Sequence, residues 1–290
     1  MTAKRIIVGY DRSPEAKFAA AWALDEAART GAPVELFYAY EWPEWAPAAS
    51  MMPAPAIWPD GETDRAIKGM LDEAVAAARQ SHPGVRTTAS IMHAGAALTL
   101  RDRSSDASLI VLGSRGHNAI AAVGSVSVAV SAHAHCPVVV VRGEPKRAAP
   151  VVAGIDQSDC ASLVLAFAFE QAAARGVPLR VIRTGSFALG FLEERPVVAE
   201  QIVKDEQRAL EDFVAGWREK FPDVQVSATY VTGHPADALT AASNDAQLVV
   251  VGTRGRGALR GMLLGSVSQH LLHRSPCAVA VIREMNGASS

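Results

Sequence analysis

The sequence lacks a disulfide framework, an excess of one charge and a long apolar run, and each absence excludes a class of protein. It has only 3 cysteines, none in a C-x-x-C pair, so we expect reduced thiols with structural roles. Its 28 basic and 30 acidic residues are interleaved, which leaves no basic stripe to hold a polyphosphate backbone. No apolar stretch reaches the ~18 residues of a membrane span, and the short run before Asp11 is no signal peptide. We therefore expect a cytoplasmic protein without a nucleic-acid or membrane partner.

The composition is typical of a soluble globular protein. Hydrophobic residues make up 49% of the sequence and charged residues 20%, which provides enough apolar surface for the chain to fold. A length of 290 residues suits two compact domains, since domains usually contain ~100–150 residues. Two hydrophobic cores are therefore expected.

The two halves of the chain repeat each other. When residue 6 is placed on residue 151, IIVGYDRS matches VVAGIDQS, and SSDASLIVLGSRG in the first half matches SNDAQLVVVGTRG in the second. Both halves contain GSVS, and they end in CPVVVVR and CAVAVIR. The segment GEPKRAAP between them carries prolines and charges without apolar periodicity, as a linker does. We predict domains over 1–142 and 151–290, joined by a linker over 143–150.

Short β-branched runs alternate with longer helical patterns in each half. In the first half we expect strands over 5–9, 34–39, 86–92, 108–113 and 137–142, and helices over 13–31, 61–82, 96–104 and 124–134. Runs such as LIVLG and LVVVG are apolar at successive residues, which is typical of strands buried on both faces of a parallel sheet. The pattern therefore predicts an α/β fold in which each half is a five-stranded, parallel, doubly wound sheet.

The last predicted strands, 137–142 and 277–283, are strongly apolar and would otherwise be exposed edges of their sheets. Natural proteins seldom leave such edges bare, because unpaired backbone groups invite association with another chain. We therefore predict that these strands pair, either within one compact chain or between the subunits of a homodimer.

A glycine-rich segment follows the fourth predicted strand of each half. Sheets of this kind bind ligands at the carboxyl ends of their strands, beside strands one and four. In the second half the segment reads G-x2-G-x9-G-S and begins at Gly252, while Asp156 ends strand one. A P-loop is excluded because no G-K-[ST] is present, and NAD and FAD are disfavoured because their glycine fingerprint follows strand one.

The spacing of these glycines is suited to holding phosphate groups. We expect Gly252 and Gly255 to allow φ values that other residues avoid and a close approach of phosphate oxygens. Gly265 and Ser266 begin the next predicted helix, whose free N–H groups and dipole favour an anion. The arginines that would add positive charge are Arg254, Arg256 and Arg260. The alternative is that the glycines only shape a turn, but their recurrence in both halves, together with the aspartate, favours a nucleotide site.

These residues resemble the universal stress protein family in its tandem-domain, actinobacterial form, over about residues 4–142 and 150–283. The motif G-x2-G-x9-G-[ST] is typical of the ATP-binding branch of that family. The resemblance implies two Rossmann-like domains of the adenine-nucleotide α-hydrolase type, packed about a pseudo-twofold axis, with ATP, alone or with Mg²⁺, as ligand. It also implies that the aspartate contacts adenosine and the loop holds phosphates. By position the second-domain residues are Gly154, Asp156, Gly252, Thr253, Arg254, Gly255, Arg256, Gly265, Ser266, Val267 and Ser268.

The loop is shorter in the first domain. Only the seven residues HNAIAAV separate its second and third glycines, and the positions corresponding to Arg260 and Gly261 are absent or apolar. We therefore predict a weaker or empty site there. Its residues by position are Gly9, Asp11, Gly113, Ser114, Arg115, Gly116, Gly124, Ser125, Val126 and Ser127.

Other segments offer little chemistry. The sequence HAHC over 133–136 contains zinc-ligand types but lies between a helix end and a strand without a second cluster, so no metal is predicted. No G-x-S-x-G elbow or paired strand-end carboxylates are present, and no catalytic residue is predicted. The segment 41–62 holds five prolines and three tryptophans. It is expected to cover a helix of its own domain, to form a lid over the first-domain cleft, or to form an interface.

The leading interpretation is an ATP-binding regulator of stress or dormancy that acts through contacts with an unidentified protein partner. One alternative is a slow ATP hydrolase of the adenine-nucleotide α-hydrolase group, although neither the S-G-G-x-D-S nor the H-I-G-H motif of that group follows strand one. The other alternative is a scaffold that binds no nucleotide.

Overall fold

The structure is a computed structural model, and it describes residues 4–40, 61–116, 123–144, 146–185, 196–253, 255 and 264–283. Several features singled out in the sequence lie outside these residues. They are the proline- and tryptophan-rich segment over 41–60 and the loop residues Arg254, Arg256, Arg260 and Gly261.

Strands and helices alternate along both halves of the chain. The first half contains β1 (Arg5–Gly9), α1 (Pro14–Thr30), β2 (Val34–Ala39), α2 (Gly61–Ser81), β3 (Thr87–Met92), α3 (Ala96–Arg103), β4 (Ala107–Gly113), α4 (Ser125–His133) and β5 (Val138–Val141). The second contains β6 (Val151–Ile155), α5 (Cys160–Arg175), β7 (Leu179–Gly185), α7 (Pro196–Lys220), β8 (Val226–Thr232), α8 (Pro235–Ser243), β9 (Leu248–Gly252), α9 (Ser266–Arg274) and β10 (Ala278–Ile282). Every bound in the first half lies within one residue of the predicted one.

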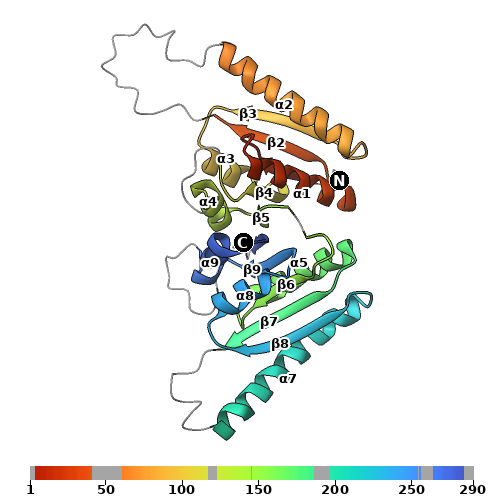
Figure 1. The fold of residues 1–290 in the computed structure, drawn as a ribbon, viewed down its shortest axis with the longest axis vertical. Helices are drawn as coiled ribbons and strands as arrows, with labels where there is room; N and C mark the ends of the chain where they lie inside the picture. The colour runs from red at the N-terminus through yellow and green to blue at the C-terminus, as the bar shows by residue number, and fades with distance from the viewer. Residues whose placement is uncertain are drawn as a thin grey trace, which may run out of the picture.

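All ten strands join one sheet, in the order β3-β2-β1-β4-β5-β10-β9-β6-β7-β8 (Figure 1). Within each half, neighbouring strands are parallel, so the predicted α/β fold class is confirmed. The halves meet where β5 and β10 pair antiparallel, with Val139 opposite Ala280. This is the predicted pairing of the last strands, formed within one chain, and it merges the two five-stranded sheets into a single one.

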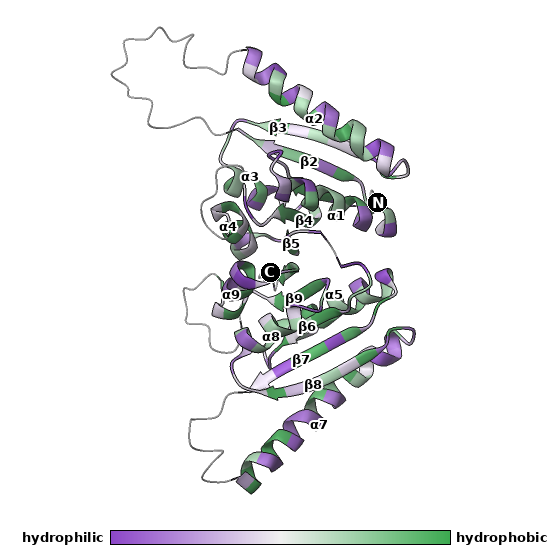
Figure 2. Ribbon diagram, viewed as in Figure 1, coloured by the Kyte–Doolittle hydropathy of each residue, from purple (hydrophilic) through white to green (hydrophobic). Residues whose placement is uncertain are grey.

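Helices cover both faces of the sheet because the strands are apolar on both sides (Figure 2). Ile6 and Val8 of β1 pack into the core beneath α1, α2, α5 and α7, while Ile7 packs into the core beneath α3, α4, α8 and α9. This alternation follows from the two-residue period of a strand. The continuous apolar runs of the sequence are therefore explained by burial on two faces.

The ends of α1 are set by local sequence. Ser13 precedes the helix, and its hydroxyl accepts a hydrogen bond from the backbone N–H of Ala16 at 3.1 Å. Pro14 occupies the first helical turn, where its missing N–H costs nothing. Gly31 ends the helix with a φ of 72°, and its repeat counterpart Gly176 ends α5 with a φ of 63°. Glycine adopts this left-handed conformation without strain.

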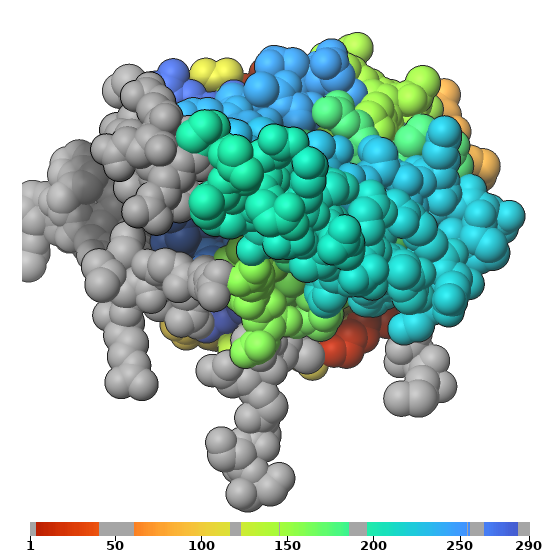
Figure 3. Space-filling model, turned by 90° about the horizontal axis from the view of Figure 1, so that it is seen from below, coloured from red at the N-terminus to blue at the C-terminus, as the bar shows by residue number. Residues whose placement is uncertain are grey.

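The longest helices, α2 and α7, lie at the two outer ends of the molecule (Figures 1 and 3). Each buries one stripe of apolar side chains, such as Ile67 and Leu71 of α2 and Leu210 and Val214 of α7, and turns polar residues outward. In the described part of the chain, no helix combines the length and apolarity that crossing a membrane requires.

A buried polar cluster joins α1 to α5 beside the β5–β10 junction. Glu26 accepts a hydrogen bond from Gln171 at 2.8 Å and pairs with Arg175 at a nitrogen–oxygen distance of 3.0 Å. The Arg175 guanidinium also lies 5.0 Å from the ring centroid of Trp22. The repeat that places residue 6 on residue 151 also places Glu26 on Gln171. Two equivalent side chains therefore meet across the pseudo-twofold relation between the halves.

Two arginines cross the junction on the opposite face of the sheet. Arg142, which follows β5, donates hydrogen bonds to the carbonyls of Leu272 at 2.9 Å and His273 at 3.1 Å, near the end of α9. Arg283, which follows β10, donates to the carbonyl of Ala132 at 2.8 Å, near the end of α4. Each half therefore supplies a cation to the carboxyl end of the other half's helix, where free carbonyls and the helix dipole favour positive charge.

The substitution Glu26→Ala tests the buried cluster. It would leave Arg175 buried without its carboxylate, and breaking a buried pair in this way costs about 3–5 kcal/mol of unfolding free energy. The measurement is urea denaturation. Arg29→Ala is the matched control, because Arg29 pairs with the same carboxylate at 3.1 Å but is more exposed, and its loss should cost below ~1 kcal/mol. Equal losses from the two substitutions would contradict the assigned role of Arg175.

Candidate functional site

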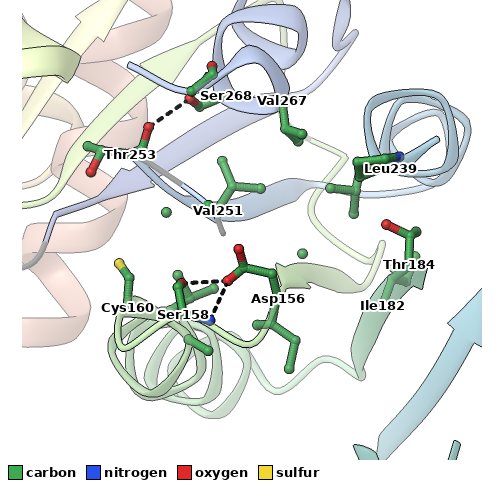
Figure 4. A pocket seen from close by; sticks show the side chains of 18 of the residues that line it. Asp156, Ser158, Cys160, Ile182, Thr184, Leu239, Val251, Thr253, Val267 and Ser268 are labelled. Carbon is green, nitrogen blue, oxygen red and sulfur yellow. Dashed lines mark hydrogen bonds between the residues drawn. The ribbon is translucent and has the colours of Figure 1, made fainter. Parts of the chain in front are cut away.

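A cleft of about 480 Å³ opens at the carboxyl ends of β6 and β9 and the start of α9. This is the place where parallel sheets of this kind bind ligands. All the predicted second-domain residues that the structure describes line it: Gly154, Asp156, Gly252, Thr253, Gly255, Gly265, Ser266, Val267 and Ser268. Figure 4 shows Asp156 in the middle of this pocket in projection, between Thr253 and Ser268 on one side and Ile182 and Thr184 on the other.

The carboxylate of Asp156 is held in place by the turn that follows β6. One of its oxygens accepts hydrogen bonds from the backbone N–H of Ser158 at 3.0 Å and from the Ser158 hydroxyl (Figure 4). Asp11 is held in the same way in the first domain, by the backbone N–H and hydroxyl of Ser13. The repeated sequence therefore folds into the same local structure twice.

The glycine loops pack directly against these carboxylates. A Cβ atom at Gly255 would lie 2.7 Å from an oxygen of Asp156, and one at Gly116 would lie 2.8 Å from an oxygen of Asp11. Both distances are too short for any side chain. Neither glycine has a φ in the left-handed region, so the expectation of an unusual φ at Gly255 is wrong. The residue must be glycine because the loop and the aspartate approach so closely.

The base of the loop is the same in both domains although the loops differ in length. The N–H of Gly265 donates to the carbonyl of Thr253 at 2.6 Å, and the N–H of Gly124 donates to the carbonyl of Ser114 at 2.8 Å. These hydrogen bonds join the two ends of each loop. The difference between nine and seven intervening residues is therefore taken up in the loop tip, which lies outside the described residues.

The start of α9 presents backbone N–H groups to the cleft. Gly265 precedes the helix, and no side chain caps it. Ser266 is exposed at the first helical position, whereas the buried hydroxyl of Ser268 donates to the carbonyls of Gly265 at 2.9 Å and Thr253 at 3.2 Å. The Ser268 hydroxyl thus holds the loop against the helix. Free N–H groups and the positive end of the helix dipole make this end of the cleft favourable for an anion.

Sequence reasoning missed the apolar wall of the cleft. Ile182 at the end of β7 and Leu239 on α8 line it, and Gly154 packs so closely on Leu239 that a Cβ would lie 2.5 Å away. These residues belong to elements outside the glycine motif. Because β7 neighbours β6 in the doubly wound strand order, its carboxyl end could have been included from topology alone.

The equivalent first-domain cleft is smaller, about 350 Å³. It is lined by nine of the ten predicted residues: Gly9, Asp11, Gly113, Arg115, Gly116, Gly124, Ser125, Val126 and Ser127. Ser114 is buried behind this surface. Phe37 and Leu112 stand where the second domain has Ile182 and Val251, and these larger side chains are consistent with the smaller volume.

The HAHC segment shows no arrangement suited to metal binding. His133 lies at the end of α4 with its Nδ1 2.8 Å from the carbonyl oxygen of Ala129. Cys136 is buried, and burial raises the pKa of its thiol to about 12, so it stays protonated at neutral pH. Across the described ranges, no three His, Cys, Asp or Glu residues gather as a metal site would need.

Comparison with known proteins places the chain among relatives of the same length and fold. The sequence model of the universal stress protein family matches residues 2–142 and 149–283. Two universal stress proteins of Mycobacterium tuberculosis are each 34% identical to the chain, over 295 and 289 residues, with 96% of this chain and 97% and 96% of those proteins covered. A universal stress protein of Mycolicibacterium smegmatis is 32% identical over 295 residues, with 96% of each protein covered.

Solved structures show the same fold. A universal stress protein from Archaeoglobus fulgidus matches with a TM-score of 0.70 at 18% identity, covering 99% of both chains. A functionally unknown protein from Pseudomonas aeruginosa matches with a TM-score of 0.66 at 16% identity, covering 97% of this chain and 92% of that one. The sequence relatives and the two family matches agree with the resemblance seen in the motifs. The chain therefore belongs to the universal stress protein family, as a tandem of two of its domains.

Proposed function

We propose that the second-domain cleft binds ATP, alone or with Mg²⁺, and that the protein is a nucleotide-dependent regulator of stress or dormancy acting through contacts with another protein. The observation that carries the proposal is the convergence of three features on one cleft of about 480 Å³: a fixed carboxylate, a glycine loop and an uncapped helix start. Each suits a different part of a nucleotide.

The cleft separates apolar from anion-binding surface, as a nucleotide requires. Ile182, Leu239 and Val251 supply apolar contact for a base. Asp156 can accept hydrogen bonds from ribose hydroxyls or the adenine amino group. The start of α9 at Ser266 supplies N–H groups and a positive dipole end for phosphates. This order follows the roles that the family resemblance assigns to the same positions.

The first-domain cleft is proposed to hold ATP weakly or not at all. Its volume is about 350 Å³, and its loop has two residues fewer between the second and third glycines. Each charge-assisted hydrogen bond lost to a phosphate is worth ~1.5–3 kcal/mol, or about tenfold or more in affinity. One ATP per chain is therefore the expected stoichiometry.

We propose binding with little or no turnover. Among the described residues that line the cleft, Asp156 is the sole carboxylate, and Ser158 already donates two hydrogen bonds to one of its oxygens. A general base would have to reach a water molecule aligned with the phosphate chain. The residue suited to that role is absent from the described lining, and this favours a binding protein over the hydrolase alternative.

Gly265→Asp tests the phosphate end of the cleft. Gly265 has a φ of -73°, which aspartate adopts readily, and aspartate is a favourable residue before a helix. The fold should therefore survive while the new carboxylate repels phosphates. We expect ATP affinity, measured by titration calorimetry, to fall at least ~100-fold, corresponding to the loss of about two charge-assisted hydrogen bonds.

Gly124→Asp is the matched control, because Gly124 occupies the same position before α4 with the same φ of -73°. It should change ATP affinity less than ~2-fold, which is under 0.5 kcal/mol. Equal losses from the two substitutions, or two equivalent ATP molecules bound to the unmodified protein, would contradict the assignment of the site to the second domain.

Asp156→Asn tests the nucleoside end. The asparagine oxygen can still accept from Ser158, but the second carboxylate oxygen is replaced by an N–H₂ group that cannot accept a hydrogen bond. We expect ATP affinity to fall about tenfold or more, with Asp11→Asn as the control that leaves it nearly unchanged. An unaltered affinity for Asp156→Asn would show that the ligand lies elsewhere.

The fate of the bound nucleotide separates binding from hydrolysis. After prolonged incubation with ATP and heat denaturation, anion-exchange chromatography of the supernatant is expected to recover ATP at near one equivalent. Recovery of AMP with pyrophosphate would instead support the hydrolase alternative. Failure of any nucleotide to be retained would support the scaffold.

A further inference from the structure

An ion pair occupies the anion-binding side of the first-domain cleft. Arg115 lines the cleft, and its guanidinium lies 3.2 Å from the carboxylate of Glu15, in the first turn of α1. The Glu15 side chain is only 19% exposed, while that of Arg115 is 49% exposed. The described cation of this loop is therefore already paired by a partly buried carboxylate.

Glu15 cannot easily move away from the loop. A Cβ atom at Gly113 would lie 2.7 Å from the backbone carbon of Glu15 and 2.9 Å from its Cβ. The end of β4 and the start of α1 are thus in close contact at this point. The backbone of Glu15 is held beside the loop, and its carboxylate stays within reach of the space beside Arg115.

The second domain has a neutral group at the same place. The repeat aligns Glu15 with Cys160, which is buried and lines the larger cleft. Its thiol donates to the carbonyl of Ile282 at 3.5 Å. An anion that enters the second-domain cleft at this position meets a thiol, whereas in the first domain it meets a carboxylate.

The rest of the first-domain cleft is aromatic and uncharged apart from Asp11. Tyr10, Phe37 and Tyr38 line it, where the second domain has aliphatic residues at the first two positions. Burial raises the pKa of both Tyr10 and Tyr38, so their phenols are protonated at neutral pH. Aromatic side chains of this kind provide contact surface for a planar ring, and Asp11 provides acceptors for hydroxyl or amino groups.

We propose that Glu15 makes the first-domain cleft selective for an uncharged nucleoside and against the same nucleoside carrying a phosphate chain. The inference rests on the nucleotide site proposed for the second domain, whose architecture the first-domain cleft repeats. A phosphate chain placed beside Arg115 would compete with Glu15 for the cation and be repelled by its carboxylate. A nucleoside has no such conflict and fits the smaller, aromatic cleft.

The test uses the full chain with the second-domain site disabled by Asp156→Asn and Gly265→Asp together. Adenosine and ATP are titrated separately into this variant by calorimetry. We expect adenosine to bind at least ~10-fold more tightly than ATP, which is about 1.4 kcal/mol. ATP binding at least as tightly as adenosine, or no detectable adenosine binding, would overturn the proposal.

Glu15→Cys and Glu15→Gln, each added to the disabled variant, identify the cause of the selectivity. Glu15→Cys installs the residue of the second domain, and Glu15→Gln removes the charge while keeping the shape. Both should raise ATP affinity at least ~10-fold and change adenosine affinity less than ~3-fold. An unchanged ATP affinity in both variants, with unfolding curves like those of the parent, would show that Glu15 does not select the ligand.

Cys160→Glu in the otherwise unmodified protein is the converse variant. It should lower ATP affinity of the second domain at least ~10-fold and spare adenosine binding. The outcomes also separate the two proposals. If the unmodified protein binds no ATP, the proposed function fails, whereas the adenosine titration and the Glu15 variants still decide the selectivity of the first-domain cleft.

Discussion

The antiparallel pairing of β5 with β10 is the interaction on which the arrangement of this molecule depends. Each half alone would end in an unpaired strand of nearly continuous valine or alanine, an edge that natural proteins avoid exposing. Pairing Val139 with Ala280 removes both edges at once and turns two sheets into one. It also brings α1 against α5 and carries Arg142 and Arg283 to the ends of the opposite helices.

The junction is not symmetric in chemistry although it is nearly symmetric in backbone. Glu26 faces its own repeat counterpart, which is Gln171, and Arg175 neutralises the pair. Pairing two copies of the first half would set Glu26 against Glu26 in a buried place. A buried carboxylate without a partner is strongly unfavourable, so the unlike pair favours association of unlike halves. One gene-encoded repeat thus gained an internal preference for its partner.

The two clefts show how a shared backbone can serve different ligands. Their hydrogen-bonded aspartates, the close contact between aspartate and glycine, and the closure of the loop base are equivalent. The differences lie in side chains that surround this framework, such as Phe37 in place of Ile182. Because the framework is held by backbone hydrogen bonds, such replacements can alter size and charge without altering the fold.

The sequence by itself determined the elements, their order and the place of the site. Its apolar runs are long enough and its glycines and prolines clear enough that local propensity and burial agree, and the repeat gave every assignment a second, independent copy. The aspartates and glycine loops were predicted for the same reason, since both follow strand ends. The tertiary structure decided what depends on residues distant in sequence. It showed that Gly255 is required by contact with Asp156 rather than by φ, that Leu239 and Ile182 wall the cleft, and that Glu15 pairs with Arg115. No pattern within one segment specifies such contacts, because they arise only when separate elements are packed together.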